Sequence, residues 1–97
     1  MNVVFHDDAL AEYLAAVVWY ERDYSGRGYR FRTAVERTLM TIAREPLSFP
    51  ERLGHRVALV SRFPYLLAFD VLDDTRIRVL AVAHVKRQPG YWRSRGR

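Results

Sequence analysis

Residues 65–84 read YLLAFDVLDDTRIRVLAVAH, two apolar runs around one polar turn. Val, Ile, Leu and Phe favour strands, whereas Asp73-Asp74-Thr75 has the composition of a tight turn. The stretch therefore predicts two antiparallel strands, over 65–72 and 76–84. Alternation along the second strand predicts two opposite faces: Ile77, Val79, Ala81 and Ala83 on one, and Arg76, Arg78, Leu80, Val82 and His84 on the other.

A third strand is expected just upstream, at Arg56–Phe63, which is rich in Val and Leu. Pro64 cannot donate to a strand ladder, so a turn or an edge position is expected there. Leu47–His55 contains turn-forming residues and predicts a loop. Because the connections are short, the three strands should form an antiparallel meander.

Two amphipathic helices are expected before these strands. Apolar residues recur at helical spacing over about 8–24 and 27–45, and Pro46 ends the second pattern. Gly26-Arg27-Gly28 permits a tight reversal, so the helices should form an antiparallel hairpin. The spacing selects this apolar face for the first helix: Leu10, Tyr13, Leu14, Val17, Tyr20 and Tyr24. Core packing is also the expected role of Trp19, and the alternative is a role in the helical hairpin or in a groove that binds a partner.

The N-terminal residues complete the expected fold. Val3-Val4-Phe5 predicts a first strand, and Asp7 or Asp8 is expected to cap the first helix. The expected class is α+β, with an N-terminal strand, an antiparallel helical hairpin and a three-stranded antiparallel meander that form one sheet. Helices on one side would leave the other face of the sheet open and concave. Three side chains are expected there: Arg62, Arg78 and His84.

The composition bounds the class of protein. A chain of 97 residues is expected to form a single domain over 1–97, and 49% apolar residues exclude a disordered chain. Cysteine is absent, which excludes disulfides and thiolate metal sites. The longest apolar run, Leu14–Tyr20, is far shorter than the roughly 20 residues that cross a bilayer, and no targeting pattern is visible. A soluble, cytoplasmic protein without a membrane partner is expected.

The net charge of +5 is concentrated in one segment. Residues 1–85 contain eleven arginines and eleven acidic residues, which cancel. The basic C-terminal segment, residues 86–97, contains five basic residues and no acid. Such a segment favours an acidic partner, either nucleic acid or an acidic protein segment. The other interpretation is a solvated tail that aids solubility.

The order and the residue patterns of these segments resemble those of the RelE/ParE superfamily of toxins over nearly the whole chain. These motifs carry the resemblance: Asp8–Leu14 at the start of the first helix, Gly26–Phe31 at the start of the second, Arg44-Glu45-Pro46 with Pro50 at its end, Arg62-Phe63-Pro64-Tyr65 between the middle strands, and Val82–Arg87 with its His-x-x-Arg ending.

This resemblance implies the toxin of a type II toxin–antitoxin system, with growth arrest and plasmid stabilization as its context. It also implies a cognate antitoxin as a partner, and on the alternative role of Trp19 this residue would lie in an antitoxin groove. A toxin–antitoxin hetero-oligomer can follow. RelE-like members of the superfamily cut messenger RNA on the ribosome, whereas ParE-like members inhibit DNA gyrase. The helix pattern and the ending from His84 to Arg87 resemble ParE more closely. The preferred hypothesis is therefore a gyrase inhibitor and not an enzyme.

The alternative is a RelE-like messenger RNA endonuclease. With Tyr65 aligned to the tyrosine of the corresponding turn, the basic positions of those nucleases fall on apolar residues here: Val57, Leu59 and Leu66. A remaining set of nuclease candidates is His84, Arg87, Tyr91 and Arg62. A histidine could act as general acid or base, and arginines could hold phosphate. The other two histidines, His6 and His55, are expected at the surface or in loops.

On the ParE-like hypothesis, the partner-binding surface combines cations with flat amphipathic rings, a composition typical of binding hot spots. Its candidate residues are Arg62, Arg78, His84, Lys86, Arg87, Tyr91, Trp92, Arg93 and Arg95. The sequence leaves open whether Tyr91 and Trp92 instead fold back onto the sheet as core cover. Pro89-Gly90 supplies a turn that would allow this.

A hypothesis from another class is a non-toxic nucleic-acid-binding module. The basic segment favours such a module, but the neutral balance of residues 1–85 disfavours it. No cofactor and no metal are implied, because the histidines are dispersed and the acidic residues form no ligand cluster. The Gly26–Gly28 segment lies between helices and is not a phosphate-binding loop.

Overall fold

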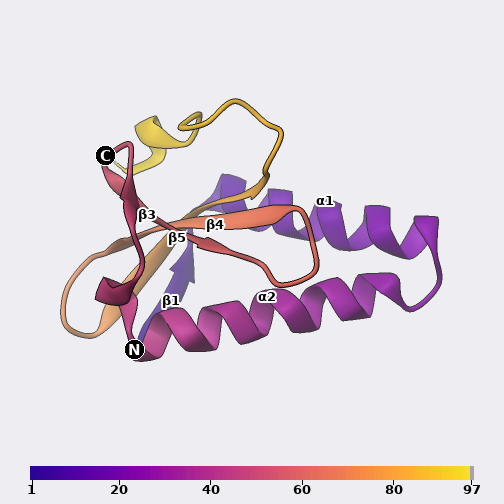
Figure 1. Ribbon diagram of the computed structural model, residues 1–97, viewed down its shortest axis with the longest axis horizontal. Helices are drawn as coiled ribbons and strands as arrows, with labels where there is room; N and C mark the ends of the chain where they lie inside the picture. The colour runs from indigo at the N-terminus through magenta and orange to yellow at the C-terminus, as the bar shows by residue number, and fades with distance from the viewer. Residues whose placement is uncertain (97) are drawn as a thin grey trace.

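The computed structural model describes residues 1–96, in which a helical hairpin packs against one mixed sheet (Figure 1). The helices are α1 (Asp7–Asp23) and α2 (Arg27–Arg44), and two short 3-10 helices cover Pro46–Ser48 and Arg93–Gly96. The strands are β1 (Asn2–Phe5), β2 (Glu51–Arg52), β3 (His55–Leu59), β4 (Tyr65–Val71) and β5 (Arg76–His84). The expected α+β class, the hairpin and the antiparallel meander are confirmed.

The sheet has the strand order β1-β5-β4-β3-β2. β1 runs parallel to β5, with Val3 opposite Ile77, and the other neighbours are antiparallel. β2 is an additional strand that the sequence predicted as loop. It was missed because its two residues are polar and exposed, and they gain strand structure only through pairing with β3.

The strand β3 ends at Leu59, earlier than the predicted Phe63. The chain turns there because Arg62 adopts a left-handed backbone conformation (φ 70°). The Val60 N–H donates to the Tyr65 carbonyl at 2.9 Å and closes this turn.

An irregularity between β4 and β5 changes which side chains share a face. Ala68 lies opposite Ala81, but Phe69 lies opposite Val79, so Leu80 is the extra residue of a bulge. The predicted alternation along β5 is therefore wrong beyond Val79. Ile77, Val79 and Val82 belong to the core cluster under the helices, whereas Leu80, Ala81 and Ala83 belong to a second cluster.

The hairpin between the helices is fixed by Glu21. Its Oε1 accepts hydrogen bonds from the N–H groups of Gly26 at 3.0 Å and Gly28 at 3.1 Å. A Cβ atom on Gly28 would lie 2.7 Å from the Val17 carbonyl oxygen, so only glycine allows this close approach of α2 to α1.

The start of α1 corrects the expected cap. His6 is the N-cap, and its Nδ1 accepts from the Asp8 N–H at 3.1 Å. Asp7 and Asp8 instead occupy the first turn, where negative charge is favourable at the positive end of the helix dipole.

The helix-side core is rich in aromatic rings. Tyr20 and Phe31 lie 5.0 Å apart between ring centroids, and Phe63 lies 5.0 Å from Tyr20. From α1 the buried residues are Ala9, Ala16 and Tyr20, and from α2 they are Gly28, Phe31, Val35 and Ile42.

The buried face of α1 was predicted partly wrongly. Leu10, Leu14, Trp19 and Tyr24 are exposed, because the buried face of the helix is the one that carries Ala9, Ala16 and Tyr20. Tyr13 and Val17 pack at the margin of the core. Neither helix within residues 1–96 combines the length and apolar character of a membrane span.

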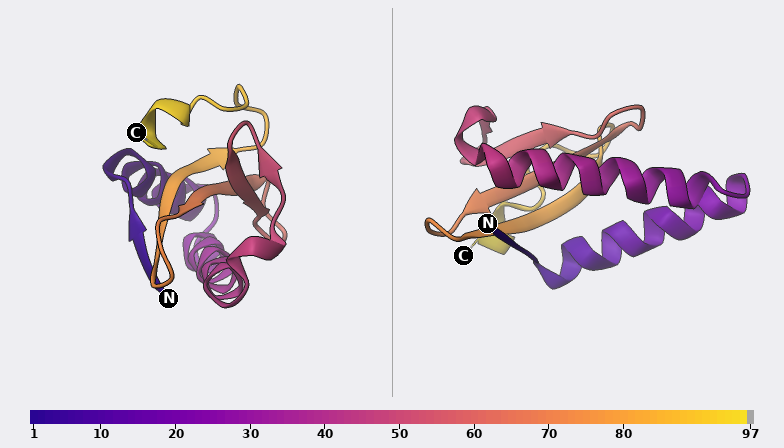
Figure 2. Two further views of the ribbon diagram at one scale, coloured as in Figure 1. Left: turned by 90° about the vertical axis from the view of Figure 1, so that its left-hand side faces the viewer. Right: turned by 90° about the horizontal axis from the view of Figure 1, so that it is seen from below.

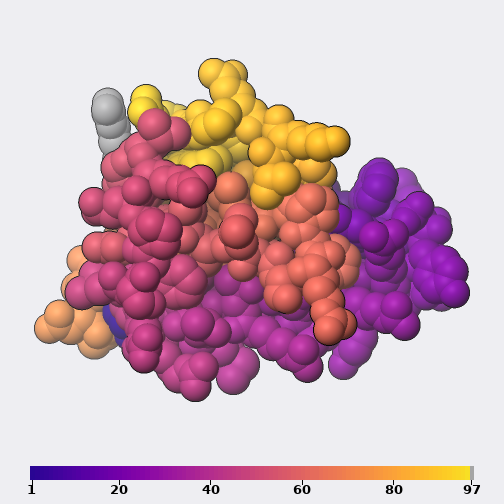
Figure 3. All heavy atoms as spheres, viewed as in Figure 1, coloured from indigo at the N-terminus to yellow at the C-terminus, as the bar shows by residue number. Residues whose placement is uncertain are grey.

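The second face of the sheet is covered by the C-terminal segment, so the expectation of an open face is wrong. Trp92 is 3% exposed and packs in the second cluster with Val57, Ala68 and Leu80. The segment lies above the sheet in Figure 1, and α2 lies below it. In the left view of Figure 2 the segment again lies above the sheet and α2 below it, and the segment forms the upper surface of the space-filling view in Figure 3.

Candidate functional site

The carboxylate of Glu12 holds the C-terminal segment onto the body of the protein. Its Oε2 accepts from the Tyr91 hydroxyl at 2.7 Å and from Arg87 Nη1 at 3.3 Å. Arg95 Nη1 donates to Glu12 Oε1 at 3.0 Å, and Arg95 Nη2 donates to Oε2 at 3.2 Å. The side chains of Glu12 and Arg95 are only 16% and 15% exposed, so solvent screens this contact weakly. We call this set the Glu12 cluster: Glu12, Arg87, Tyr91 and Arg95.

Tyr91 lies at the centre of the Glu12 cluster. The guanidinium carbon of Arg87 lies 3.9 Å from the centroid of its ring, and that of Arg95 lies 5.1 Å away, within the range of cation–π contacts. Burial, and then the hydrogen bond to Glu12, raise the pKa of the Tyr91 hydroxyl well above its ordinary value of 10. At neutral pH this hydroxyl is therefore a protonated donor and cannot act as a base.

A groove opens between α1 and the start of the C-terminal segment. We call it the tail groove; it is lined in part by Trp19, Tyr65, His84 and Arg87. His84 Nδ1 accepts from the Lys86 N–H at 3.1 Å, and its ring packs edge-on against Tyr65 at 5.3 Å between centroids. His84 thus fixes the direction in which the chain leaves β5.

Trp19 is the residue of the tail groove that sequence reasoning assigned wrongly. It was expected in the core, but it is 61% exposed. Its ring packs edge-on against that of Tyr20 at 5.1 Å between centroids, so it is held in place at the surface. A signal was present in the sequence, because Trp19 and the buried Tyr20 are neighbours and cannot share one helix face.

The predicted partner-binding residues divide into two groups. Lys86, Arg87 and Arg93 are exposed, and His84 lines the tail groove. Trp92 is buried on the sheet, and Tyr91 and Arg95 are engaged with Glu12. The question that the sequence left open is thereby answered for Trp92, which covers the core. Arg97, the last residue of the basic segment, lies outside the described residues.

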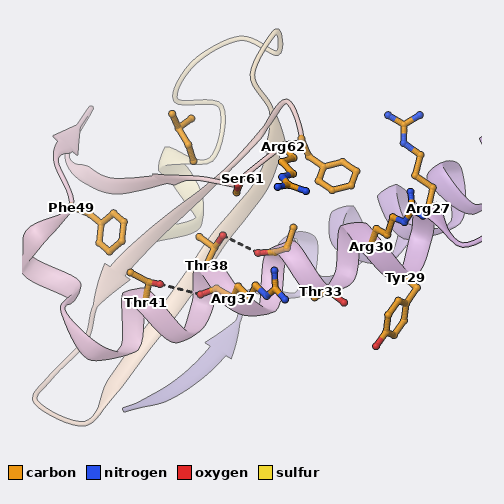
Figure 4. Close-up of a pocket in the computed structure, with 13 residues that line it drawn as sticks. Arg27, Tyr29, Arg30, Thr33, Arg37, Thr38, Thr41, Phe49, Ser61 and Arg62 are labelled. Carbon is orange, nitrogen blue, oxygen red and sulfur yellow. Dashed lines mark hydrogen bonds between the residues drawn. The ribbon is translucent and has the colours of Figure 1, made fainter.

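Arg62 and Arg78 lie away from the tail groove. Arg62, in the turn after β3, lines a separate groove beside α2 (Figure 4). Arg78 lines a small pocket with Arg56 and Asp70, and its Nε is buried without a hydrogen-bond partner among the described residues. Of the nuclease candidates, the structure brings His84, Arg87 and Tyr91 together and leaves Arg62 apart.

His55 was expected at the surface or in a loop, and this is wrong, because it lies in β3 with its side chain only 12% exposed. Its Nδ1 lies 2.6 Å from Asp70 Oδ1, and its side chain is mostly buried on β3. The end of the C-terminal segment packs there, because a Cβ on Gly96 would lie 2.8 Å from His55 Cε1. Within residues 1–96, no group of His, Asp and Glu side chains has the arrangement of a metal site.

Comparison with known proteins adds one match. The family model described as ParE toxin of type II toxin-antitoxin system, parDE, matches residues 3–89. These residues include the hairpin, β1 from its second residue, β2 through β5, His84 and Arg87. A comparison with curated proteins gave no match.

Proposed function

The chain belongs to the ParE toxin family of type II toxin–antitoxin systems, and from this premise we propose that it inhibits DNA gyrase until a cognate antitoxin neutralises it. The proposal assigns target binding to the tail groove, which Arg87 lines, and to two further exposed cations of the C-terminal segment, Lys86 and Arg93. The chain acts by binding, not by cutting RNA.

The observation that carries this proposal is the engagement of Tyr91 and Arg87 by Glu12. Cleavage of RNA needs a base, an acid and cations that stabilise charge on phosphate. Tyr91 is protonated and already donates to a carboxylate. The same carboxylate would repel a phosphate placed near Arg87. The alternative of a RelE-like nuclease is therefore disfavoured.

Binding is supported by the composition of the tail groove. An exposed Trp held against a second ring, with an Arg nearby, is the kind of anchor that dominates protein interfaces. Trp19 and Arg87 are the residues we assign as anchors for the target. His84 is a positioning residue that acts through the backbone of Lys86.

Two assays on the purified chain test the proposal. In the first, gyrase supercoils a relaxed plasmid in the presence of increasing toxin; in the second, messenger RNA is followed in a translating extract. Loss of supercoiling with intact messenger RNA supports the proposal. Messenger RNA cleavage with normal supercoiling overturns it in favour of the nuclease. Unimpaired growth on expression, with salt-sensitive binding to nucleic acid, would favour the non-toxic binding module.

A further inference from the structure

A second groove lies between α2 and the turn that connects β3 to β4 (Figure 4). All its charged lining residues are arginines: Arg27, Arg30, Arg37 and Arg62. Among residues 1–96, no acidic side chain lines it. We call it the arginine groove; it shares Arg27 with the tail groove, whereas the proposed anchors Trp19 and Arg87 line only the tail groove.

Most of this positive charge has no ion-pair partner among residues 1–96. Arg27 pairs with Asp23 at 2.8 Å, but Arg30, Arg37 and Arg62 form no ion pair with any described residue. Residues 1–85 are neutral overall, so the groove is a local concentration of charge and not part of a generally basic surface. Such a surface attracts an acidic partner.

Apolar side chains lie deeper in the same groove. Ala34, Phe49 and Phe63 line it and are partly buried against the core. Leu59, at the end of β3, is 74% exposed and adds an apolar wall. The arginines are exposed and lie around these residues, so the groove presents an apolar floor with a basic rim. An amphipathic partner with acidic flanks matches both parts.

The spacing along α2 suits a helical partner. Arg30, Ala34, Arg37 and Thr41 follow each other at intervals of four, three and four residues, so they share one face of the helix. Seven residues of helix rise about 10.5 Å, which separates Arg30 from Arg37 along the axis. A second helix lying along α2 with acidic residues seven apart would present carboxylates at the same interval.

Nucleic acid fits the arginine groove less well. The hydroxyls of Thr38 and Thr41 donate to the carbonyls of Ala34 at 2.9 Å and Arg37 at 3.2 Å, so they are not available to donate to phosphate. Tyr29, a ring that could stack on a base, points away from the turn of Ser61 and Arg62 in Figure 4. A phosphate backbone would also leave the apolar floor without a partner.

We propose that the arginine groove binds an acidic amphipathic helix and that this helix belongs to the antitoxin. The inference rests on neutralisation by an antitoxin, as in the proposed function, and adds where and by which chemistry the antitoxin is held. Arg30 and Arg37 bind its carboxylates, and Ala34, Phe49 and Phe63 receive its apolar side chains.

Binding of a synthetic peptide by the full chain tests the inference. The probe is a fluorescein-labelled peptide of about 18 residues, made of Leu, Ala and Glu with the leucines on one helical face. A scrambled peptide of the same composition tests the need for that face. The variant R30A/R37A removes two charges of the groove, and R22A/R44A removes two exposed helical charges outside it. Thermal unfolding of each variant confirms that it is folded.

The expected result is binding of the amphipathic peptide, weakened about tenfold in R30A/R37A and within about twofold of the unchanged chain in R22A/R44A. The scrambled peptide should bind more weakly than the amphipathic one. Equal binding by R30A/R37A and the unchanged chain would overturn the inference, as would tighter binding of an oligothymidine strand than of the peptide. Supercoiling by gyrase in the presence of the unchanged chain tests the proposed function separately, so either proposal can fail alone.

Discussion

The Glu12 carboxylate and the Tyr91 hydroxyl lie 2.7 Å apart, although 79 residues separate them in the sequence. Glu12 also accepts from the backbone N–H of Val82 in β5 at 3.1 Å. One side chain of α1 therefore joins a helix, the last strand of the meander and the C-terminal segment.

Replacing Glu12 should loosen the C-terminal segment. E12A leaves Arg95 partly buried without its carboxylate, and we expect the free energy of unfolding to fall by about 3 kcal/mol. Chemical denaturation measures the loss. The control is E36A, which removes an exposed ion pair with Arg32 and should cost less than about 0.5 kcal/mol. Equal stability of E12A and the unchanged chain would contradict the role of the junction.

Alkaline pH should lower the free energy of unfolding, because Tyr91 loses its proton. Its folded-state pKa is raised above the unfolded value of about 10, so the unfolded chain loses this proton first. The resulting stabilisation is complete below pH 10 and disappears as the pH rises from there toward the folded pKa. Tyr13, Tyr20 and Tyr65 contribute in the same direction, because burial raises the pKa of each.

Denaturation midpoints measured across this alkaline range test the prediction. Y91F should be less stable than the unchanged chain at neutral pH and should lose less stability as the pH rises. A steeper alkaline loss in Y91F would show that Tyr91 does not hold its proton in the folded state.

Replacement by alanine should lower the stability of the protein far more at Trp92 than at Trp19. Trp92 is 3% exposed against the sheet, so W92A should cost about 4 kcal/mol, measured by denaturation. Trp19 is exposed, and W19A should change stability by less than about 0.5 kcal/mol. Similar costs for both variants would contradict the docking of the C-terminal segment on the second face.

Substitutions of surface residues in the tail groove should weaken target binding. W19A and R87A remove the proposed anchors of the tail groove, and each should raise the toxin concentration needed to inhibit supercoiling by about tenfold. Y24A is the control, because Tyr24 is exposed near the end of α1 and does not line the tail groove. Undiminished inhibition by both anchor variants would remove the assignment of this surface.

Gly28 should not tolerate a side chain. A Cβ there would lie 2.7 Å from the Val17 carbonyl oxygen and 3.0 Å from Glu21 Cβ, so G28A forces the two helices apart. We expect a loss of about 2 kcal/mol, although alanine favours helix more than glycine does. Thermal unfolding measures it, with S25A at an exposed neighbouring position as the control. A gain in stability would show that the helices can separate at no cost.

Elements with a local signature could be predicted from the sequence. β5 begins at Arg76 and ends at His84 as expected, and α2 begins at Arg27 and ends one residue before the expected position. Their apolar spacing and the flanking Pro46 and Asp73-Asp74-Thr75 act within a few residues. The bulge at Leu80 could not be predicted, because it depends on how β4 and β5 fit the core on both faces.

Less of the candidate site than of the fold could be predicted from the sequence. The basic segment and His84 were found from charge and motif, but Glu12 gave no signal, because its partners lie 70 to 83 residues away. Trp92 was ambiguous because a bulky ring in a basic segment could bind a partner or pack on the chain's own sheet. Only the course of the chain after His84 decides between them.

The parallel pairing of β1 with β5 also has a consequence for folding while the chain is being synthesised. A ribosome makes β1 first, and this strand must wait for its neighbour until the meander has been almost fully translated. Until then Glu12 also lacks Tyr91 and Arg95. A growing chain therefore completes neither its sheet nor the Glu12 cluster until the last strand and the C-terminal segment have been made.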